Sequence, residues 1–188
     1  MVKALVRSEA KPEEGELIGQ LISQGAYKDA LARCARAYST QLGRLCMALT
    51  GSQAEAEELV QETLIAALDA FPSFRFESPV RSWLYGIARR ICGRHNEMKN
   101  RRQAKLRLVH DTGKGLDTTE LAIEKERAQR ARQALASLKP SEREAVVLRY
   151  DAGLSFREVA EACGVDEAAA RKRVSRALVR LRESLADV

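Results

Sequence analysis

Apolar and polar residues recur with a helical period along most of the chain. The clearest case is residues 57–71, whose apolar positions are Val60, Leu64, Ala67, Leu68 and Phe71. This spacing places them on one face of an α-helix. The opposite face is acidic, with Ile65 among Glu57, Glu58, Gln61, Glu62 and Asp69. Periodicity alone favours a solvated surface for this face, and a docking face for a basic protein is the alternative.

Other stretches repeat this helical pattern. Apolar residues predict helix over 17–37, with Gly25 as a break, and over 38–49. After an interruption at 72–79, Ser78 and Pro79 suit the N-cap and first position of a new helix. Its apolar stripe is Val80, Leu84, Ile87, Ala88 and Ile91. The pattern fades around 110–115 and resumes from about Thr119 to Leu138, and no stretch is typical of a strand. The fold is therefore predicted to be all-α, with two lobes joined by a linker.

Three Ser-x-x-Glu spacings predict helix starts. In a capping box the Ser hydroxyl accepts a hydrogen bond from the N–H three residues on, and the Glu carboxylate reaches back to the Ser N–H. The three pairs are Ser52 with Glu55, Ser141 with Glu144, and Ser155 with Glu158.

The C-terminal stretch 154–182 has the plan of a helix-turn-helix. A short helix from Phe156 is followed by Gly164, which tolerates a positive φ, and Asp166 can cap a second helix. That second helix has an apolar stripe (Ala170, Val174, Ala177, Leu178, Leu181) opposite a basic side (Arg171, Lys172, Arg173, Arg176, Arg180). In a helix-turn-helix the second helix enters the DNA major groove. An ordinary helical hairpin with a solvated basic face is the alternative.

Charge supports a polyanionic partner. Among 188 residues, 32 Lys and Arg outnumber 26 Asp and Glu, and the excess is clustered. The four cysteines and two histidines show no metal-ligand spacing, so the cysteines are expected to be reduced and buried. No stretch is typical of a secretion signal or a membrane-spanning helix, so we expect a cytoplasmic protein without membrane insertion.

Aromatic and basic residues gather in 74–102. Three Phe residues lie in or beside the loop 72–79, Trp83 and Tyr85 follow, and a strongly basic run begins at Arg89. Aromatic side chains beside a basic helix suit stacking on unpaired bases together with phosphate contacts. A role for Trp83 in the core alone is equally compatible with its position.

The order of these parts resembles the extracytoplasmic-function group of bacterial RNA polymerase sigma factors, in the sigma-70 family. AEAEELVQETLIAALDAFPSF and FRFESPVRSWLYGIARR are similar to the two halves of sigma region 2. LKPSEREAVVLRYDAGLSFREVAEACGVDEAAARKRVSRALVRLR is similar to region 4. The resemblance implies an N-terminal arm over 1–15, region 2 over 16–104, a linker over 105–128 and region 4 over 129–188.

The resemblance also implies roles for individual residues. Core-polymerase docking falls to Glu57, Glu58, Leu59, Gln61, Glu62 and Thr63. The resemblance assigns capture of an extruded −10 base to the loop 74–79, which contains Phe74, Arg75 and Phe76. It assigns further contact with the −10 element to Arg81, Trp83, Arg89, Arg90 and Arg94. Reading of the −35 element falls to Glu167, Arg171, Lys172, Ser175 and Arg176. Arg90 and Arg94 stand where the family usually has Asn and Asp, so the identity of the captured base is not predicted.

These features favour an alternative sigma factor that is not an enzyme and needs no cofactor or metal. Its implied partners are core RNA polymerase, through the largest subunits, promoter DNA and an anti-sigma factor. The linker can bridge two promoter boxes, and it also lets the lobes fold onto each other. We expect weak duplex binding by the isolated chain.

Two other classes fit less well. A helix-turn-helix repressor or activator with an N-terminal dimerisation lobe has no need for the aromatic and basic stretch 74–102. An enzyme on a helical scaffold would need a catalytic constellation, and the sequence offers no nucleophile with a base, phosphate loop or metal cluster.

Overall fold

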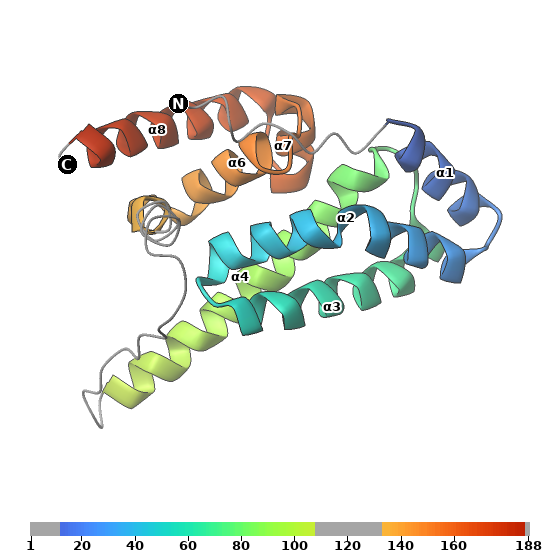
Figure 1. The fold of residues 1–188 in the computed structure, drawn as a ribbon, viewed down its shortest axis with the longest axis horizontal. Coiled ribbons are helices and arrows are strands. Elements are labelled where there is room, and N and C mark those ends of the chain that lie inside the picture. Colours follow the sequence, from blue (N-terminus) through green and yellow to red (C-terminus); the bar gives the residue numbers. More distant parts are fainter. Residues whose placement is uncertain (1–11, 108–132, 187–188) are drawn as a thin grey trace, which may run out of the picture.

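The computed structural model describes residues 12–107 and 133–186, which form two packed helical lobes (Figure 1). The N-terminal lobe contains α1 (Pro12–Ser23), α2 (Tyr27–Thr50), α3 (Gln53–Ala70), the 3₁₀ turn η2 (Phe71–Ser73) and α4 (Val80–Arg107). The C-terminal lobe contains a helical segment over 133–137, α6 (Pro140–Tyr150), α7 (Phe156–Cys163) and α8 (Glu167–Ala186). Neither described range contains a strand, and the predicted all-α class is confirmed.

Several local signals act as predicted. Gly25 has a φ of 75° and separates α1 from α2. Ser155 and Glu158 form both hydrogen bonds of the capping box at the start of α7. Gly164 ends α7 with a φ of 65°, and the Asp166 carboxylate accepts a 2.7 Å hydrogen bond from the Ala169 N–H at the start of α8. The turn of the predicted helix-turn-helix is therefore present.

The other two capping boxes are incomplete or wrong. Ser52 accepts from the Glu55 N–H, but the Glu55 carboxylate lies against Lys99 and His95 of α4 instead of reaching back. At α6 the N-cap is Lys139, without a side-chain cap, because the helix begins at Pro140. Ser141 therefore lies inside the helix, and Glu144 instead forms an ion pair with Arg89 of α4.

The start of α4 also differs by one residue from its prediction. The carbonyl of Pro79 accepts a 3.1 Å hydrogen bond from the Trp83 N–H, and the helix begins at Val80. Pro79 therefore precedes the first helical residue, which it was predicted to be. The stripe from Val80 to Ile91 is buried as predicted.

The buried face of α3 is rotated relative to the predicted stripe. The residues that lie fully in the core are Ala56, Leu59, Thr63 and Ala67, whereas Val60, Leu64 and Leu68 are half-buried. The Thr63 hydroxyl is satisfied locally, because it donates a 2.6 Å hydrogen bond to the Leu59 carbonyl. Since α3 packs against both α2 and α4, small side chains occupy the closest approach and the larger ones flank it.

The two lobes pack directly on each other. In Figure 1, α7 lies beside the first half of α4, and α6 lies beside α2. A Cβ added to Gly86 of α4 would lie 3.6 Å from the carbonyl oxygen of Ala162 in α7, so these helices approach closely. Buried residues of both lobes form one continuous hydrophobic cluster. The contact agrees with the expectation that the lobes could fold onto each other.

The other structural expectations concern cysteines and unplaced segments. Cys34, Cys46, Cys92 and Cys163 are all free and buried, as predicted. Among the described helices, none has the length and apolarity to cross a bilayer. The predicted arm (1–15) and linker (105–128) were each drawn too long, because residues 12–15 begin α1 and residues 105–107 end α4. The remainder of both segments, and the helix predicted from Thr119 up to residue 132, lie outside the described residues.

Candidate nucleic-acid interface

The acidic face of α3 is exposed only in part. Glu57, Glu58, Gln61 and Glu62 are exposed, and Ile65 among them is 61% exposed. Leu59 and Thr63 are only 3% and 0% exposed, because they belong to the rotated core face. Their prediction as docking residues does not fit this position. The exposed candidate surface therefore consists of three acids, one amide and one aliphatic side chain; we call it the α3 acidic face.

Ion pairs tie α3 to the basic side of α4. The Glu55 carboxylate lies 2.6 Å from Lys99 Nζ and 3.2 Å from His95 Nε2. Burial acts to raise the pKa of Glu55, but the contacts with Lys99 and His95 outweigh it and the pKa is lowered. Glu62 also lies 3.4 Å from Arg94, although both side chains remain mainly exposed. Acids two turns apart on α3 thus hold the basic half of α4 in place.

A hollow of about 870 Å³ opens between α1, the loop 74–79, the start of α4 and α7. Its aromatic wall is Phe74 against Phe76, with ring centroids 4.7 Å apart in an edge-on arrangement. Phe74 is buried, whereas Phe76 is 51% exposed and has a φ of 57°, unusual for a bulky residue. The predicted base-capturing loop therefore presents an aromatic side chain to a hollow large enough for a nucleobase.

The other walls of this hollow include residues that were not predicted to belong to the site. Gly15 and Gly19 lie four residues apart on α1, and a Cβ on Gly19 would sit 3.7 Å from the Phe76 ring. Glu158 of the C-terminal lobe also lines the hollow. The Gly-x-x-x-Gly spacing could have been noticed in the sequence, whereas the approach of α7 has no local signal.

The position of Trp83 is compatible with both of its alternative roles. Its ring centroid lies 5.7 Å from that of Phe71 and 4.8 Å from that of Phe74, so Trp83 packs against the aromatic residues at both ends of the turn that leads into the loop 74–79. It is only half-buried, and with Arg90 and Arg94 it lines a second hollow of about 280 Å³ between α3 and α4. An aromatic ring beside two guanidinium groups suits a stacked base with a nearby phosphate.

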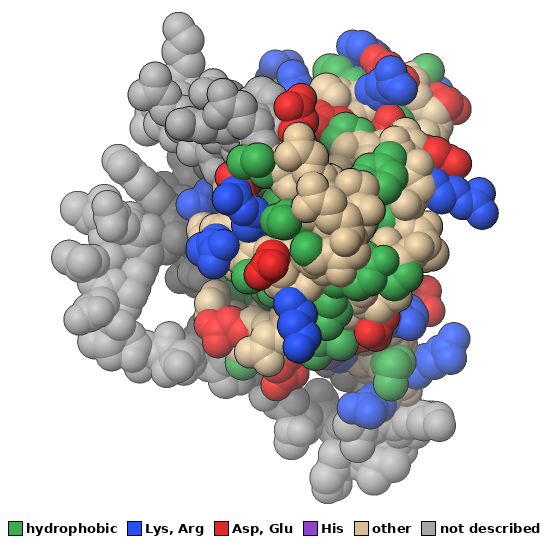
Figure 2. Space-filling model, turned by 90° about the vertical axis from the view of Figure 1, so that its right-hand side faces the viewer, with side chains coloured by type: hydrophobic (Ala, Val, Ile, Leu, Met, Phe, Trp, Pro, Cys, Tyr) green, Lys and Arg blue, Asp and Glu red, His purple; other side chains and the backbone are tan. Residues whose placement is uncertain are grey.

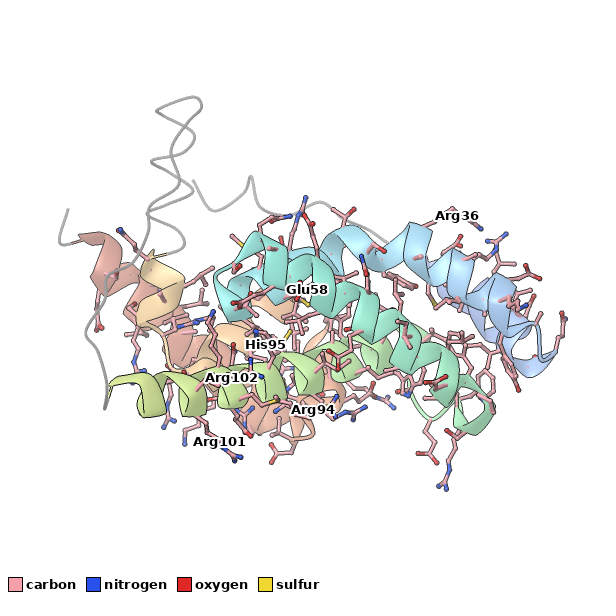
Figure 3. The ribbon with its side chains drawn as sticks, turned by 90° about the horizontal axis from the view of Figure 1, so that it is seen from below. Arg36, Glu58, Arg94, His95, Arg101 and Arg102 are labelled. Carbon is pink, nitrogen blue, oxygen red and sulfur yellow. The ribbon has the colours of Figure 1, made fainter. Side chains whose placement is uncertain are left out.

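Arginines of α4 fall into two groups. Arg90 and Arg94 are exposed. Figure 3 shows Arg94, Arg101 and Arg102 projecting from α4, with Glu58 on the neighbouring helix α3. Arg75 in the loop is also exposed. From the α1 end, Figure 2 shows charged side chains mainly around the edge of a centre of backbone and uncharged side chains. These exposed arginines can reach DNA phosphates, although Arg94 must first leave Glu62.

Arg81 and Arg89 instead form ion pairs with the C-terminal lobe. Arg81 lies 2.9 Å from Glu158, and Arg89 lies 2.5 Å from Glu144. Burial acts to raise the pKa of Glu158, but its bonds with Ser155 and the contact with Arg81 outweigh burial and lower it. The contact with Glu144 raises the pKa of Arg89. Two predicted −10 residues are therefore engaged within the chain.

A third ion pair joins the lobes. Arg44 of α2 lies 3.4 Å from Asp151 at the end of α6. In all three pairs the arginine belongs to the N-terminal lobe and the acid to the C-terminal lobe. The two lobes are thus complementary in charge where they meet.

The basic side of α8 faces outward. Arg171, Lys172, Ser175 and Arg176 are exposed, and exposed Glu167 pairs with Arg171. Arg180 is half-buried and bound to Glu142 at 2.6 Å. The five predicted −35 residues therefore lie together on the first turns of the second helix, where a major groove would meet them.

Comparison with known proteins explains this arrangement. Family models match at residues 34–102, described as Sigma-70 region 2, and at residues 128–181, described as Sigma-70, region 4. EcfG of Rhodopseudomonas palustris, an ECF RNA polymerase sigma factor, is 32% identical over 147 residues, which cover 74% of this chain and 76% of EcfG.

This chain belongs to the ECF sigma factors. A second relative, the ECF factor BldN of Streptomyces coelicolor, is 30% identical over 88% of the chain. The chain spans 64% of the length of BldN and 65% of that of SigC from Mycobacterium tuberculosis. The two matched regions correspond to the two packed lobes of this sigma factor.

Solved structures are similar to this sigma factor as well. One is the sigma factor RpoE bound to the anti-sigma factor NepR of Bartonella quintana. It has a TM-score of 0.65 and 28% identity, and the match covers 79% of this chain and 91% of RpoE. CnrH bound to the cytosolic domain of CnrY also has a TM-score of 0.65, at 23% identity, with 93% and 97% covered. The likeness to CnrH concerns the fold alone.

Proposed function

We propose that this ECF sigma factor binds core RNA polymerase and directs it to promoters by reading a −10 and a −35 element. It acts by binding and not by catalysis. The observation that carries the proposal is the separation of two exposed surfaces of opposite charge. The α3 acidic face is available to a protein partner, and the basic side of α8 is available to DNA. The aromatic hollow at 74–79 adds a place for one unpaired base.

An anti-sigma factor is the partner we propose for control in the cell. The RpoE structure of Bartonella quintana is a complex with such a factor, and its sigma chain is similar to this one over most of both lengths. The α3 acidic face is the surface we expect it to cover, because covering that face also prevents polymerase docking.

The contact between the lobes limits how the isolated chain can bind DNA. Arg81 and Arg89 cannot meet −10 DNA while Glu158 and Glu144 hold them. Base extrusion costs a further few kcal/mol. The isolated chain should therefore bind duplex promoters weakly through salt-sensitive phosphate contacts, and core polymerase should separate the lobes.

Association with core polymerase tests this function directly. Purified core enzyme should retain the wild-type chain and should then open promoter DNA, seen as permanganate-reactive thymines near the −10 element. Glu58→Lys with Glu62→Lys should abolish retention, because like charges across an interface cost several kcal/mol.

A matched control separates docking from overall charge. Asp29→Lys with Glu97→Lys makes the same charge change at exposed positions of α2 and α4, and this variant should bind core enzyme normally. Normal retention of the Glu58 and Glu62 double variant would remove the docking role, and open thymines without core enzyme would contradict the proposed need for polymerase.

A further inference from the structure

Phe156, the first residue of α7, has two arginine side chains over its ring. The guanidinium carbon of Arg171 lies 4.4 Å from the ring centroid, and that of Arg149 lies 4.9 Å from it. Both distances fall within the roughly 6 Å range of a cation–π contact. Arg149 comes from the end of α6 and Arg171 from the first turns of α8. One aromatic ring therefore joins all three helices around the turn.

The Arg149 side of this cluster is firmly held. Arg149 donates a 2.8 Å hydrogen bond to the carbonyl of Leu154, a fully buried residue just before α7. Phe156 itself is half-buried and packed against the core. The ring is thus fixed by the body of the C-terminal lobe and not by the residue that would touch DNA.

The Arg171 side is restrained while still exposed. Its Nε donates a 3.1 Å hydrogen bond to Glu167, one turn earlier, in the favourable order of acid before base. The Arg171 side chain nevertheless remains 59% exposed. With the ring on one side and Glu167 on another, the guanidinium has a defined position on the surface of α8.

We infer that Phe156 is a positioning residue for −35 recognition, because its ring holds the Arg171 guanidinium in the orientation that meets a guanine edge. This rests on the proposed role of α8 in the major groove. An arginine recognises guanine with two parallel hydrogen bonds to O6 and N7, which demands a defined guanidinium plane. A side chain ordered before binding loses less conformational freedom on binding.

A purely structural role for Phe156 predicts a different outcome. If the ring only fills space, Phe156→Leu and Phe156→Met should change stability and affect all DNA sequences alike. If the ring orients Arg171, both variants should affect one base position, and Phe156→Tyr, which keeps the aromatic face, should behave as wild type.

The experiment uses the full chain with core polymerase. Duplexes of randomised sequence are selected with the wild-type holoenzyme, and binding is then measured on single-base variants of the selected −35 element. Phe156→Leu should reduce the preference for guanine at the position sensitive to Arg171→Ala, by about two- to fivefold. In the Arg171→Ala background it should have no further effect on that preference.

Three results would separate the inference from its premise. A uniform loss across all sequences with Phe156→Leu and Phe156→Met, or additive effects with Arg171→Ala, would assign the ring to packing alone and overturn the inference. Thermal unfolding of each variant identifies losses that come from folding. Unchanged preferences with both Arg171→Ala and Arg176→Ala would instead remove the −35 role of α8, on which the inference depends.

Discussion

Several buried and half-buried carboxylates in the described residues bind a base on another helix. Glu55 binds two bases of α4, Glu144 and Glu158 each bind an arginine of the N-terminal lobe, and Glu142 binds Arg180. A half-buried carboxylate needs such a partner, since burying it alone would favour its neutral form. These four carboxylates are therefore tied to the packing of the helices, whereas the acids of the α3 acidic face remain exposed.

Glu55 gives a pH-dependent prediction. Its pKa is lowered in the folded chain, so its stabilising contribution is complete above the ordinary carboxyl pKa and is lost as the pH falls through the folded value. In that acidic window the free energy of unfolding of wild type should fall more steeply with decreasing pH than that of Glu55→Gln. Urea unfolding over a pH series measures this slope. Glu58→Gln, on the exposed face of the same helix, should keep the wild-type slope, and a shared slope for all three proteins would contradict the prediction.

The cysteines give a second prediction at this scale. Burial raises the pKa of Cys34 and of Cys163 to about 12, so their reactive thiolates are scarce at neutral pH. Cys46 and Cys92 are buried together, with their sulfur atoms 3.4 Å apart. Ellman's reagent should therefore leave the native chain unmodified and react with all four thiols in guanidinium. A rapidly reacting thiol in the native chain would show that one cysteine is accessible.

At the scale of elements, sequence patterns predicted best what is decided within a few residues. The Ser155 box, the Gly164 turn and the Asp166 cap each involve neighbours along the chain, and all three are present. The box at Ser141 is absent because α6 begins one residue before Ser141, at Pro140, and Glu144 instead pairs with Arg89, far away in the sequence. Likewise, the face of α3 that is buried depends on two neighbouring helices, so the predicted stripe of Val60, Leu64 and Leu68 is only half-buried.

Substituting two glycines tests whether backbone conformation decides the effect of a Gly→Ala change on stability. Gly164 has a φ of 65°, where a side chain is strained, so Gly164→Ala should destabilise the chain by about 1–2 kcal/mol. Gly43 lies inside α2 with nothing within 4 Å of an added Cβ, so Gly43→Ala should stabilise by about 0.5–1 kcal/mol. Chemical denaturation measures both changes. Equal signs for the two substitutions would mean that backbone conformation does not decide their effect.

At the scale of the whole molecule, the same arginines have two competing partners. Arg81 and Arg89 meet acids of the C-terminal lobe in the closed chain, and they are expected to meet DNA when polymerase holds the lobes apart. Sequence patterns could not predict this contact, since the facing charges come from distant segments. Its consequence is that lobe separation and −10 binding should be coupled: whatever opens the chain should also increase its affinity for unpaired DNA.

A wedge between the lobes tests this coupling without altering any charge. A Leu side chain at Gly86 would extend into the backbone of α7 near Ala162, which forces α4 and α7 apart, and it suits the α4 helix better than glycine. Gly86→Leu should therefore increase the radius of gyration measured by X-ray scattering. It should also strengthen binding of the isolated chain to single-stranded DNA, since Arg81 and Arg89 become available. Gly93→Leu is the matched control, because Gly93 lies on the same helix, is exposed and has nothing within 4 Å of an added Cβ. If Gly86→Leu opened the chain without raising its DNA affinity, the two arginines would not be the groups that closure withholds.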